Sequence, residues 1–274
     1  MNKFNNALNI FHFLCDMKLI DTHTHLYLKE FSADIDEVIQ RGEAEGVIAF
    51  YLPAIDSTQT AAMSELEKRF PGKCIAMAGL HPCSVKGNYK EELDIVNKLL
   101  QQRKSAAIGE TGLDFYWDTS FMKEQYESLH MQAEWALQYN LPLVLHTRDA
   151  MQETIDVVKQ YRGSGLRGIF HCFSGTLQHA KDITDEGFFL GIGGVITFKN
   201  SGLGEIVKEV DLGNIVLETD APYLTPVPFR GKRNESSYLK YIVAKIAKIK
   251  NISVEEVAEQ TTRNAEKIYG EMKL

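Results

Sequence analysis

The amino-acid sequence predicts an α/β fold, and within that class a (β/α)₈ or TIM barrel. Short apolar runs rich in β-branched residues alternate eight times with amphipathic stretches of helical periodicity. The runs are apolar on consecutive residues, as expected for parallel strands that are covered on both faces. The length of 274 residues also matches the usual size of such a barrel, about 250 residues.

Each strand of the expected barrel is followed by a helix. The expected strands are Lys18–Thr22, Val47–Leu52, Cys74–Leu80, Ala106–Gly109, Leu141–His146, Gly168–His171, Phe188–Gly191 and Ile215–Glu218. The expected helices are Asp34–Glu45, Thr58–Phe70, Lys90–Gln102, Lys123–Tyr139, Met151–Tyr161, Leu177–Glu186 and Leu203–Glu209, with Ser236–Ile249 and Val254–Tyr269 after the last strand. Ser57 and Ser253 are expected N-caps, since a serine hydroxyl can accept a free N–H of the first turn.

No linker, low-complexity tract or internal repeat interrupts this pattern, so residues 17–274 are expected to form one domain. Residues 1–16 are interpreted as an N-terminal extension without a chemical role, and Met17 is an alternative start. The extension lacks the basic region and the cleavage site of a signal peptide. A flat doubly wound sheet would give the same runs; polar residues at the ends of five separate strands favour the closed barrel, which brings those ends to one opening.

Composition and charge limit the classes of function. No apolar run reaches 18 residues, so no membrane span is expected. The four cysteines form no CxxC pair, which favours reduced thiols in the cytoplasm, and Cys172 is expected to be a buried strand thiol. The net charge of −7 argues against broad contact with duplex DNA, although metal ions can supply local positive charge. We expect a monomer.

Candidate metal ligands follow the ends of the predicted strands. His23 and His25 lie two residues apart, so both point to the same side of an extended strand. His146 and His171 end two further strands. Taken alone, each histidine is as readily a core or solvent residue, but histidines at three strand ends together favour a metal site.

Two carboxylates complete the set. Glu110 follows Ala106–Gly109 and has two oxygens with which to bridge two ions, whereas its alternative role is a helix cap or an ion pair. Asp220 follows the eighth strand and is expected both to bind metal and to accept a proton from the attacking water, with an N-cap as the alternative. One plausible partition places one ion among His23, His25, Glu110 and Asp220, and a second among Glu110, His146 and His171. Such nitrogen-rich ligation suits zinc or manganese better than magnesium.

The motifs together resemble the TatD family of metal-dependent deoxyribonucleases. The matching stretches are IDTHTHL, AGLHP, AIGETGLDF, LPLVLHTRDA, FHCFSG, VLETDAPYLTP with FRGKRNE, and TTRNAEKIY. They extend from Ile20 to Glu235, with Thr261–Tyr269 resembling the closing helix of the family, and their order is far more specific than any single motif. One departure is Ser236, because the family usually has proline after the equivalent of Glu235.

The resemblance implies a TIM barrel of the metallo-dependent hydrolase type that cleaves DNA with one or two divalent ions, zinc, manganese or magnesium. It implies that the metal ligands are His23, His25, Glu110, His146, His171 and Asp220. Members are often assigned 3′-to-5′ exonuclease activity, so the expected partner is DNA, with single-stranded ends as the substrate. Glu110 and Asp220 are then expected to be catalytic as well.

Further polar residues are expected near the mouth of the barrel. His81 could protonate the leaving oxygen or serve a structural role. Asp114 and Glu218 could orient histidine ligands, although Asp114 could instead cap a loop and Glu218 could instead form a structural salt bridge. Arg148 could contact a phosphate, and Arg230 and Arg233 with Lys232 could form a basic lip, although such a charge run is as often a solvated surface.

Two alternatives to a nuclease remain open from the sequence. The same activated water could attack a carbonyl group, which would make the chain an amidohydrolase or esterase acting on a small or tRNA-linked substrate. A scaffold without turnover is the other alternative, and the complete ligand set argues against it. Tyr223 and Phe115–Trp117 could stack on nucleobases or simply pack within the outer loops.

Overall fold

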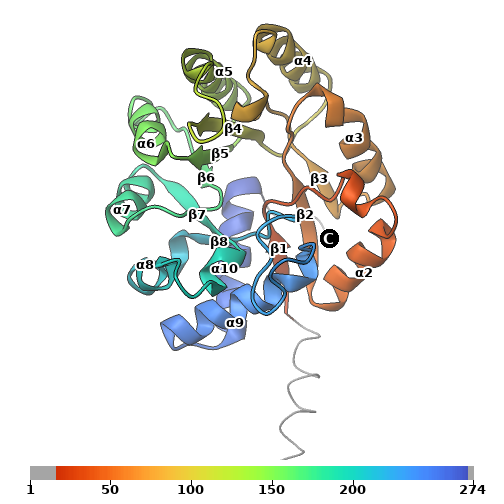
Figure 1. The fold of residues 1–274 in the computed structure, drawn as a ribbon, viewed down its shortest axis with the longest axis vertical. Coiled ribbons are helices and arrows are strands. Elements are labelled where there is room, and N and C mark those ends of the chain that lie inside the picture. The colour runs from red at the N-terminus through yellow and green to blue at the C-terminus, as the bar shows by residue number, and fades with distance from the viewer. Residues whose placement is uncertain (1–16, 271–274) are drawn as a thin grey trace, which may run out of the picture.

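A computed structural model describes residues 17–270 and confirms the predicted barrel. Eight parallel strands form the inner ring, and helices surround them (Figure 1). The strands are β1 (Leu19–Asp21), β2 (Val47–Leu52), β3 (Cys74–Ala76), β4 (Ile108–Asp114), β5 (Leu143–Arg148), β6 (Gly168–Phe170), β7 (Phe188–Ile192) and β8 (Ile215–Leu217). The expected extension at residues 1–16 lies outside the described residues.

The helices follow their predicted ranges closely. They are α2 (Ile35–Ala44), α3 (Thr60–Arg69), α4 (Tyr89–Gln102), α5 (Met122–Tyr139), α6 (Met151–Lys159), α7 (Leu177–Asp185), α8 (Leu203–Glu209), α9 (Leu239–Lys250) and α10 (Val254–Tyr269). The prediction for Ser253 is confirmed, since its side chain accepts from the Glu256 N–H. The prediction for Ser57 is wrong: Asp56 caps the turn that precedes α3, and Ser57 instead hydrogen-bonds Glu92.

Three strands differ from their predicted ranges by two or more residues at an end, and one of them, β5, begins at Leu143 and continues past His146 to Arg148. β3 ends at Ala76, and β4 begins at Ile108 and continues to Asp114. Glu110 therefore lies within β4 rather than after it. The register of β4 against β5 shifts between Ile108 and Thr111, so this carboxylate occupies an irregular part of the strand.

Two sheets and two junctions close the ring. β1–β3 pair in one sheet and β4–β8 in the other. An isolated parallel bridge between Ala78 and Ile108 joins the sheets on one side. On the other side, the Thr22 N–H donates to the Leu217 carbonyl at 3.0 Å, which connects β1 to β8. The carboxyl ends of all eight strands therefore face one opening.

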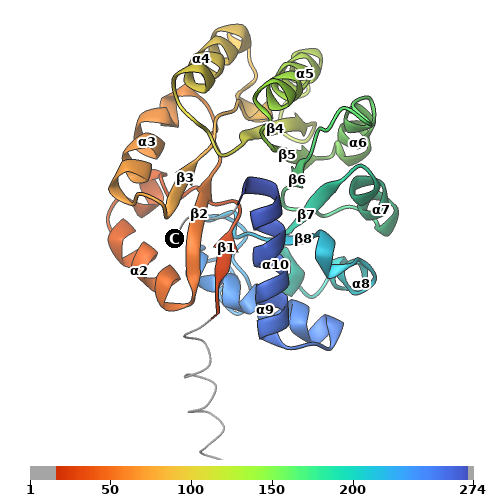
Figure 2. The same ribbon diagram turned by 180° about the vertical axis from the view of Figure 1, so that it is seen from behind.

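The interior of the ring is filled with side chains and covered at its other end. This inner core contains Ile20, Ala49, Tyr51, Met77, Ala107, Val144, Ile169 and Val216. Viewed from behind, α10 lies across the ring (Figure 2). Its Tyr269 ring stacks on Tyr51 at 3.9 Å, and Asn264 donates to the Ile215 carbonyl. Because α10 covers the amino-terminal ends, access to the interior is from the carboxyl ends.

Among residues 17–270, no helix has the length and apolar content needed to cross a lipid bilayer.

Three cysteines lie in the described part of the chain, and all are free thiols. Cys15 lies outside it. The expectation that Cys172 is a buried strand thiol is wrong, because β6 ends at Phe170 and Cys172 turns into the left-handed region with φ of 47°. Cys172 instead lines the mouth of the barrel.

Candidate metal centre

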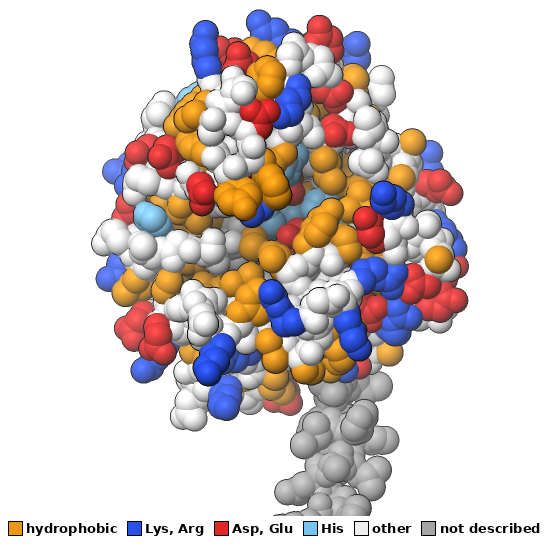
Figure 3. All heavy atoms as spheres, in the orientation of Figure 1, with side chains coloured by type: hydrophobic (Ala, Val, Ile, Leu, Met, Phe, Trp, Pro, Cys, Tyr) orange, Lys and Arg blue, Asp and Glu red, His pale blue; other side chains and the backbone are white. Residues whose placement is uncertain are grey.

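The carboxyl ends of the strands surround a hollow in which histidine side chains are visible (Figure 3). The pocket has a volume of about 720 Å³, within the size range of small-molecule sites. Among the residues that line it are His25, His81, Glu110, Asp114, Trp117, His146, Arg148, His171, Asp220 and Tyr223. The structure thus brings most of the sequence-predicted site residues into one place. His23 lies directly behind them, and Arg230 and Arg233 are not among the lining residues.

Glu110 is the centre of the cluster. Its Oε2 lies 3.2 Å from His23 Nε2 and 3.6 Å from His25 Nε2. Its Oε1 lies 2.9 Å from His146 Nδ1 and 3.2 Å from His171 Nε2. With a side chain only 2% exposed, this carboxylate stands between two groups of imidazoles, one for each oxygen. That is the geometry expected of a carboxylate that bridges two ions.

Asp220 joins the group formed by the histidines after β1. Its Oδ1 lies 3.7 Å from His23 Nε2 and 3.5 Å from His25 Nε2. The three ligand atoms lie within 4.8 Å of one another, as do those of His23, Glu110 and His171. Asp220 has φ of 54°, and its N–H donates to the His23 carbonyl, which fixes the turn after β8 against the turn after β1.

Hydrogen bonds on the outer ring nitrogens determine which imidazoles can accept an ion. A neutral imidazole has one N–H and one lone pair, and only the lone pair coordinates a metal. The Tyr27 hydroxyl donates to the Pro53 carbonyl at 2.6 Å, so its oxygen accepts the Nδ1–H of His25 at 2.9 Å. The Nε2 lone pair of His25 therefore faces Asp220 and Glu110, as a metal ligand requires.

Two carboxylates contact the outer nitrogens of two more histidines. Asp114 Oδ2 lies 2.8 Å from His146 Nε2, and Glu218 Oε1 lies 3.3 Å from His171 Nδ1. Asp114 accepts the Nε2–H of His146, which leaves the Nδ1 lone pair of that ring toward Glu110. Glu218 is in ion-pair contact with His171 Nδ1, a nitrogen that makes no hydrogen bond. Buried carboxylates in this position fix the tautomer of metal-binding histidines and make them more basic.

His81 has the opposite arrangement. The Cys83 backbone N–H donates to His81 Nδ1 at 3.0 Å, which uses that lone pair. The hydrogen of neutral His81 is therefore on Nε2, 3.3 Å from Glu110 Oε1. The ligand atoms of His81, Glu110 and His146 are close enough to share an ion, but the hydrogen on Nε2 opposes coordination by His81. We interpret His81 as a donor that points into the pocket.

The electrostatics of the cluster follow from burial and charge. Burial raises the pKa of Glu110, but the surrounding His81, His171 and His23 outweigh it and hold that pKa well below its usual range. Burial lowers the pKa of His23, with the neighbouring His171 acting in the same direction. Glu110 and His23 are thus in the protonation states that bind a divalent cation. At His171 burial lowers the pKa, but Glu110 and Glu218 outweigh it and raise that pKa well above its usual value, so an ion binding there displaces a proton.

Sequence reasoning missed the role of Asp21, which is fully buried below the cluster. Its Oδ2 accepts from the Thr219 hydroxyl and the Ser236 hydroxyl, each at 2.6 Å, and its Oδ1 accepts from the Thr219 N–H at 2.9 Å. Burial raises the pKa of Asp21 to about 7, against the effect of these hydrogen bonds. Asp21 thus connects β1, the turn after β8 and the segment before α9. The sequence signal that could have identified Asp21 is its carboxylate at the end of the apolar strand Leu19–Asp21.

Gly191 in β7 makes room for Glu218. A Cβ added there would lie 2.2 Å from Glu218 Oε2 and 3.1 Å from the His171 Cα. The other Glu218 oxygen accepts from the Cys172 N–H at 2.6 Å. Glycine at this strand position therefore allows the carboxylate to reach under His171.

The three arginines predicted to bind substrate have different surroundings. Arg233 donates to both Asp34 oxygens at 2.7 Å and to the Glu30 carbonyl. Arg148 and Arg230 have no hydrogen bond or ion pair within residues 17–270, and each lies over an aromatic ring. Only Arg148 lines the pocket. The structure therefore brings Arg148 to the cluster but ties Arg233 to the outside of the barrel.

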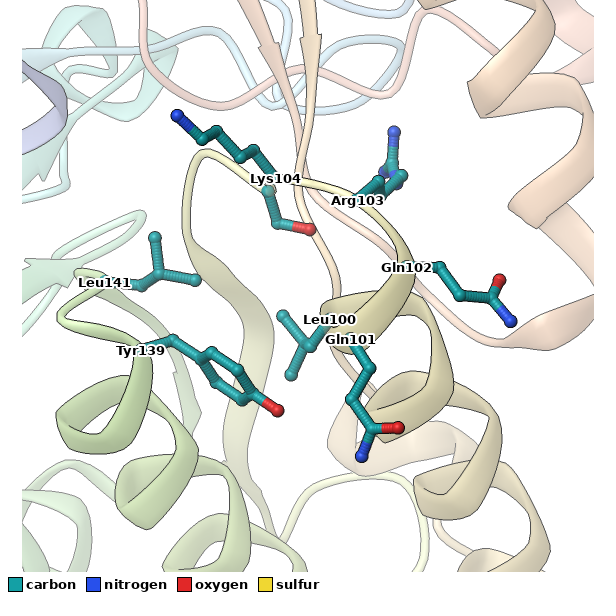
Figure 4. A pocket seen from close by; sticks show the side chains of 8 residues that line it. Leu100, Gln101, Gln102, Arg103, Lys104, Tyr139 and Leu141 are labelled. Atoms are coloured by element: carbon teal, nitrogen blue, oxygen red, sulfur yellow. The ribbon is translucent and has the colours of Figure 1, made fainter.

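A second hollow, of about 470 Å³, lies between the C-terminal ends of α4 and α5 (Figure 4). Leu100, Tyr139 and Leu141 are among the side chains that line it. Its residues immediately precede β4 and β5, so it belongs to the amino-terminal side of the barrel, opposite the cluster. None of the metal-type groups found in residues 17–270 lies there.

Comparisons with known proteins agree with this geometry. The family model for TatD-related DNases matches residues 20–270. An uncharacterized metal-dependent hydrolase of Bacillus subtilis, YabD, is 39% identical over 253 residues, covering 92% of this chain and 98% of that protein. A protein of Erwinia tasmaniensis named 3′-5′ ssDNA/RNA exonuclease TatD is 30% identical, with coverage of 92% and 99%.

A solved structure shares the same architecture. The crystal structure of YjjV, a TatD homologue from Escherichia coli, superposes with a TM-score of 0.87 at 28% identity, covering 92% of this chain and 98% of the other. The family match covers nearly all of the described chain and includes every strand that contributes to the cluster. This chain therefore belongs to the TatD-related DNase family and is a metal-dependent hydrolase.

Proposed function

We propose that the chain is a phosphodiesterase that degrades DNA from single-stranded 3′ ends. The observation that carries the proposal is Arg148, whose guanidinium has no hydrogen-bonding or charged partner in residues 17–270 and lines the pocket beside the histidine cluster. Arginine binds phosphate oxygens through paired N–H groups. The exonuclease name of the Erwinia relative supports the same substrate class.

The residues that would hold the ions are the predicted ones: His23, His25, Glu110 and Asp220 for the first, and Glu110, His146 and His171 for the second. The fit rests on the lone pairs that His25 and His146 direct inward and on the carboxylate of Glu110 between the two groups of imidazoles. Nitrogen-rich ligation favours zinc or manganese over magnesium. Bound there, a divalent ion lowers the pKa of water and offsets negative charge on phosphate oxygens.

The chain's own groups would divide the remaining work. Asp220, whose side chain is 15% exposed toward the pocket, accepts a proton from the water that attacks phosphorus. The bond between phosphorus and the 3′ oxygen of the neighbouring nucleotide breaks. His81 donates its Nε2 hydrogen to that leaving oxygen, because the Cys83 N–H holds the ring in this tautomer. Arg148 binds a phosphate oxygen and positions the strand.

Single-stranded oligonucleotides labelled at either end test this proposal. The purified protein is treated with chelator, then assayed with zinc, manganese or magnesium. We expect metal-restored shortening from the 3′ end and none with Glu110→Ala. Glu91→Ala, an exposed glutamate on α4, is the matched control and should retain full activity.

Two results would contradict the proposal. The first is full activity in Glu110→Ala. The second is no cleavage of DNA with any of the three metals by protein that is shown to bind them. That result would favour carbonyl hydrolysis, which a screen of esters and amides would then test.

A further inference from the structure

Exposed aromatic side chains stand beside the cluster, on the loop that follows β4. Trp117 is 66% exposed and Tyr116 is 52% exposed, and they are among the few large apolar side chains with so much exposure in the described chain. Their rings meet edge to face with centroids 4.9 Å apart. Apolar surface at the rim of a polar pocket indicates a binding surface more than a packing surface.

Arg148 lies on these rings. Its guanidinium carbon is 3.8 Å from the Tyr116 ring centroid and 5.0 Å from that of Trp117. A guanidinium that lies over a ring keeps its edge N–H groups available, so it can bind phosphate while adding a flat surface for a base. We define Tyr116, Trp117 and Arg148 as the shelf.

One carboxylate holds the shelf in register with the metal centre. Asp114 Oδ1 accepts the backbone N–H of Tyr116 at 3.0 Å and that of Trp117 at 3.1 Å. Its Oδ2 contacts His146 Nε2 at 2.8 Å. The position of the Trp117 backbone relative to His146 is therefore fixed through a single buried side chain.

We propose that the shelf is a nucleobase-stacking subsite beside the reacting phosphate, with the base lying on Trp117 and Arg148. The inference rests on the proposed nuclease function and deepens it by assigning what recognises the strand. On the other side of the pocket, Tyr223 is 51% exposed and offers a second ring. Every base has a π-face, so stacking predicts tolerance of sequence together with a requirement for unpaired bases.

Intrinsic fluorescence tests the contact without turnover. The chain has two tryptophans, and Trp135→Phe leaves Trp117 as the only reporter. The metal-free protein is titrated with a short thymidine strand and with a strand of equal length that carries abasic residues. We expect quenching by the thymidine strand only. Equal signals from both strands, or no signal from either, would overturn the shelf.

Kinetics on the same two strands separate the shelf from the nuclease. With metal restored, Trp117→Ala should raise KM for the thymidine strand about tenfold and leave KM for the abasic strand unchanged, because stacking contributes only when a base is present. Trp117→Phe keeps a π-face and should lose much less. Met131→Ala, an exposed residue on α5 that does not line the pocket, is the control.

The outcomes are distinct. Wild-type protein that degrades both strands, with the same KM change on both for Trp117→Ala, would overturn the shelf and leave the nuclease standing. Wild-type protein that cleaves neither strand would contradict the proposed nuclease function. The fluorescence titration would then be the test of base stacking on the shelf.

Discussion

The two halves of the metal centre are stabilised by different interactions. One half lies where β1 meets β8, and we call it the seam half. It contains His23, His25 and Asp220, whose backbone forms hydrogen bonds between the turn after β1 and the turn after β8. The His25 N–H donates to the Ala221 carbonyl at 2.8 Å, and the Asp220 N–H donates to the His23 carbonyl at 2.9 Å. Below them, Asp21 in β1 accepts hydrogen bonds from Thr219 in the turn after β8 and from Ser236 before α9.

The open half consists of His81, which follows β3, Asp114, which ends β4, and His146, which lies within β5. His81 and His146 have side-chain exposures of 14% and 16%, against 1% and 5% for His23 and His25. A single carboxylate orients His146, and the shelf stands directly above it. The seam half therefore holds buried ligands for an ion, whereas the open half leaves its histidines accessible to a substrate. Glu110 contacts both halves.

The largest expected effect comes from removing one ligand in each half. His25→Ala should lose the ion of the seam half and lower kcat by more than about 100-fold, beyond the 10- to 100-fold typical of outer partners. His146→Ala should keep that ion. Metal content after dialysis, measured with kcat, checks both, and His130→Ala on α5 is the control. Equal metal loss in both variants would contradict the distinction between the halves.

Asp114→Asn should have the next largest effect. The new amide places N–H against the His146 Nε2–H, so the imidazole loses its acceptor and its orientation. We expect metal affinity in the open half to fall by roughly 10- to 100-fold, with the seam half unchanged. Calorimetric titration with zinc measures the two steps. Asp118→Asn, in the same loop but paired with Lys86, should behave as wild type.

Arg148→Ala and Arg233→Ala separate substrate binding from support of the fold. Arg148→Ala should raise KM for DNA by about tenfold, corresponding to the loss of one charge-assisted contact. Arg233→Ala should leave KM unchanged and lower the melting temperature slightly, because its bonds are to Asp34 and Glu30. A rise in KM for Arg233→Ala alone would restore the basic lip that the sequence predicted.

Ser236→Ala should lower stability more than catalysis. The change removes one of the two hydroxyl donors to the buried Asp21 Oδ2, and a hydrogen bond contributes about 0.5–1.5 kcal/mol to the free energy of unfolding. Urea denaturation measures the loss. Ser32→Ala, whose exposed hydroxyl bonds the Lys29 carbonyl, is the control. An unchanged urea midpoint for Ser236→Ala would show that this hydrogen bond to Asp21 does not stabilise the seam half.

The smallest expected effect is on the pH dependence of stability. Burial raises the pKa of Glu235, but hydrogen bonds from Arg41 and Ser237 outweigh it and bring the pKa below its usual value. A depressed folded-state pKa stabilises the protein above the unfolded value of about 4.3, and this contribution is lost as pH falls through the folded value. The melting-temperature difference between wild type and Glu235→Gln should therefore be constant from pH 7 to about 5 and shrink in stronger acid.

The sequence predicted the barrel because the strand runs and helix periods are local signals. It also predicted the inward-facing cluster, since His23, Glu110 and Asp220 follow or interrupt apolar runs whose ends meet in a barrel. The boundary of β4 was missed because Gly109 and Glu110 interrupt the apolar pattern that marks a strand. Ser57 was chosen as a cap because nothing local showed that Asp56 would cap the turn and Glu92 would bind the serine.

Other features depend on contacts between distant parts of the chain. What separates Arg148 from Arg233 is Asp34, which binds Arg233 and not Arg148. Asp21 acquires its role from Thr219 and Ser236, both about 200 residues away along the chain. The tautomer of His81 depends on one backbone N–H. None of these contacts leaves a periodic signal in the sequence.

The closure between β1 and β8 also has a consequence for synthesis of the protein. The seam half needs His23 from the start of the barrel, Asp220 from its last strand, and Ser236 beyond that strand. A nascent chain still lacking these last segments has most of its ligands but no seam. Hydrolytic competence is therefore acquired only after the turn that follows β8 has left the ribosome and docked on the first strand.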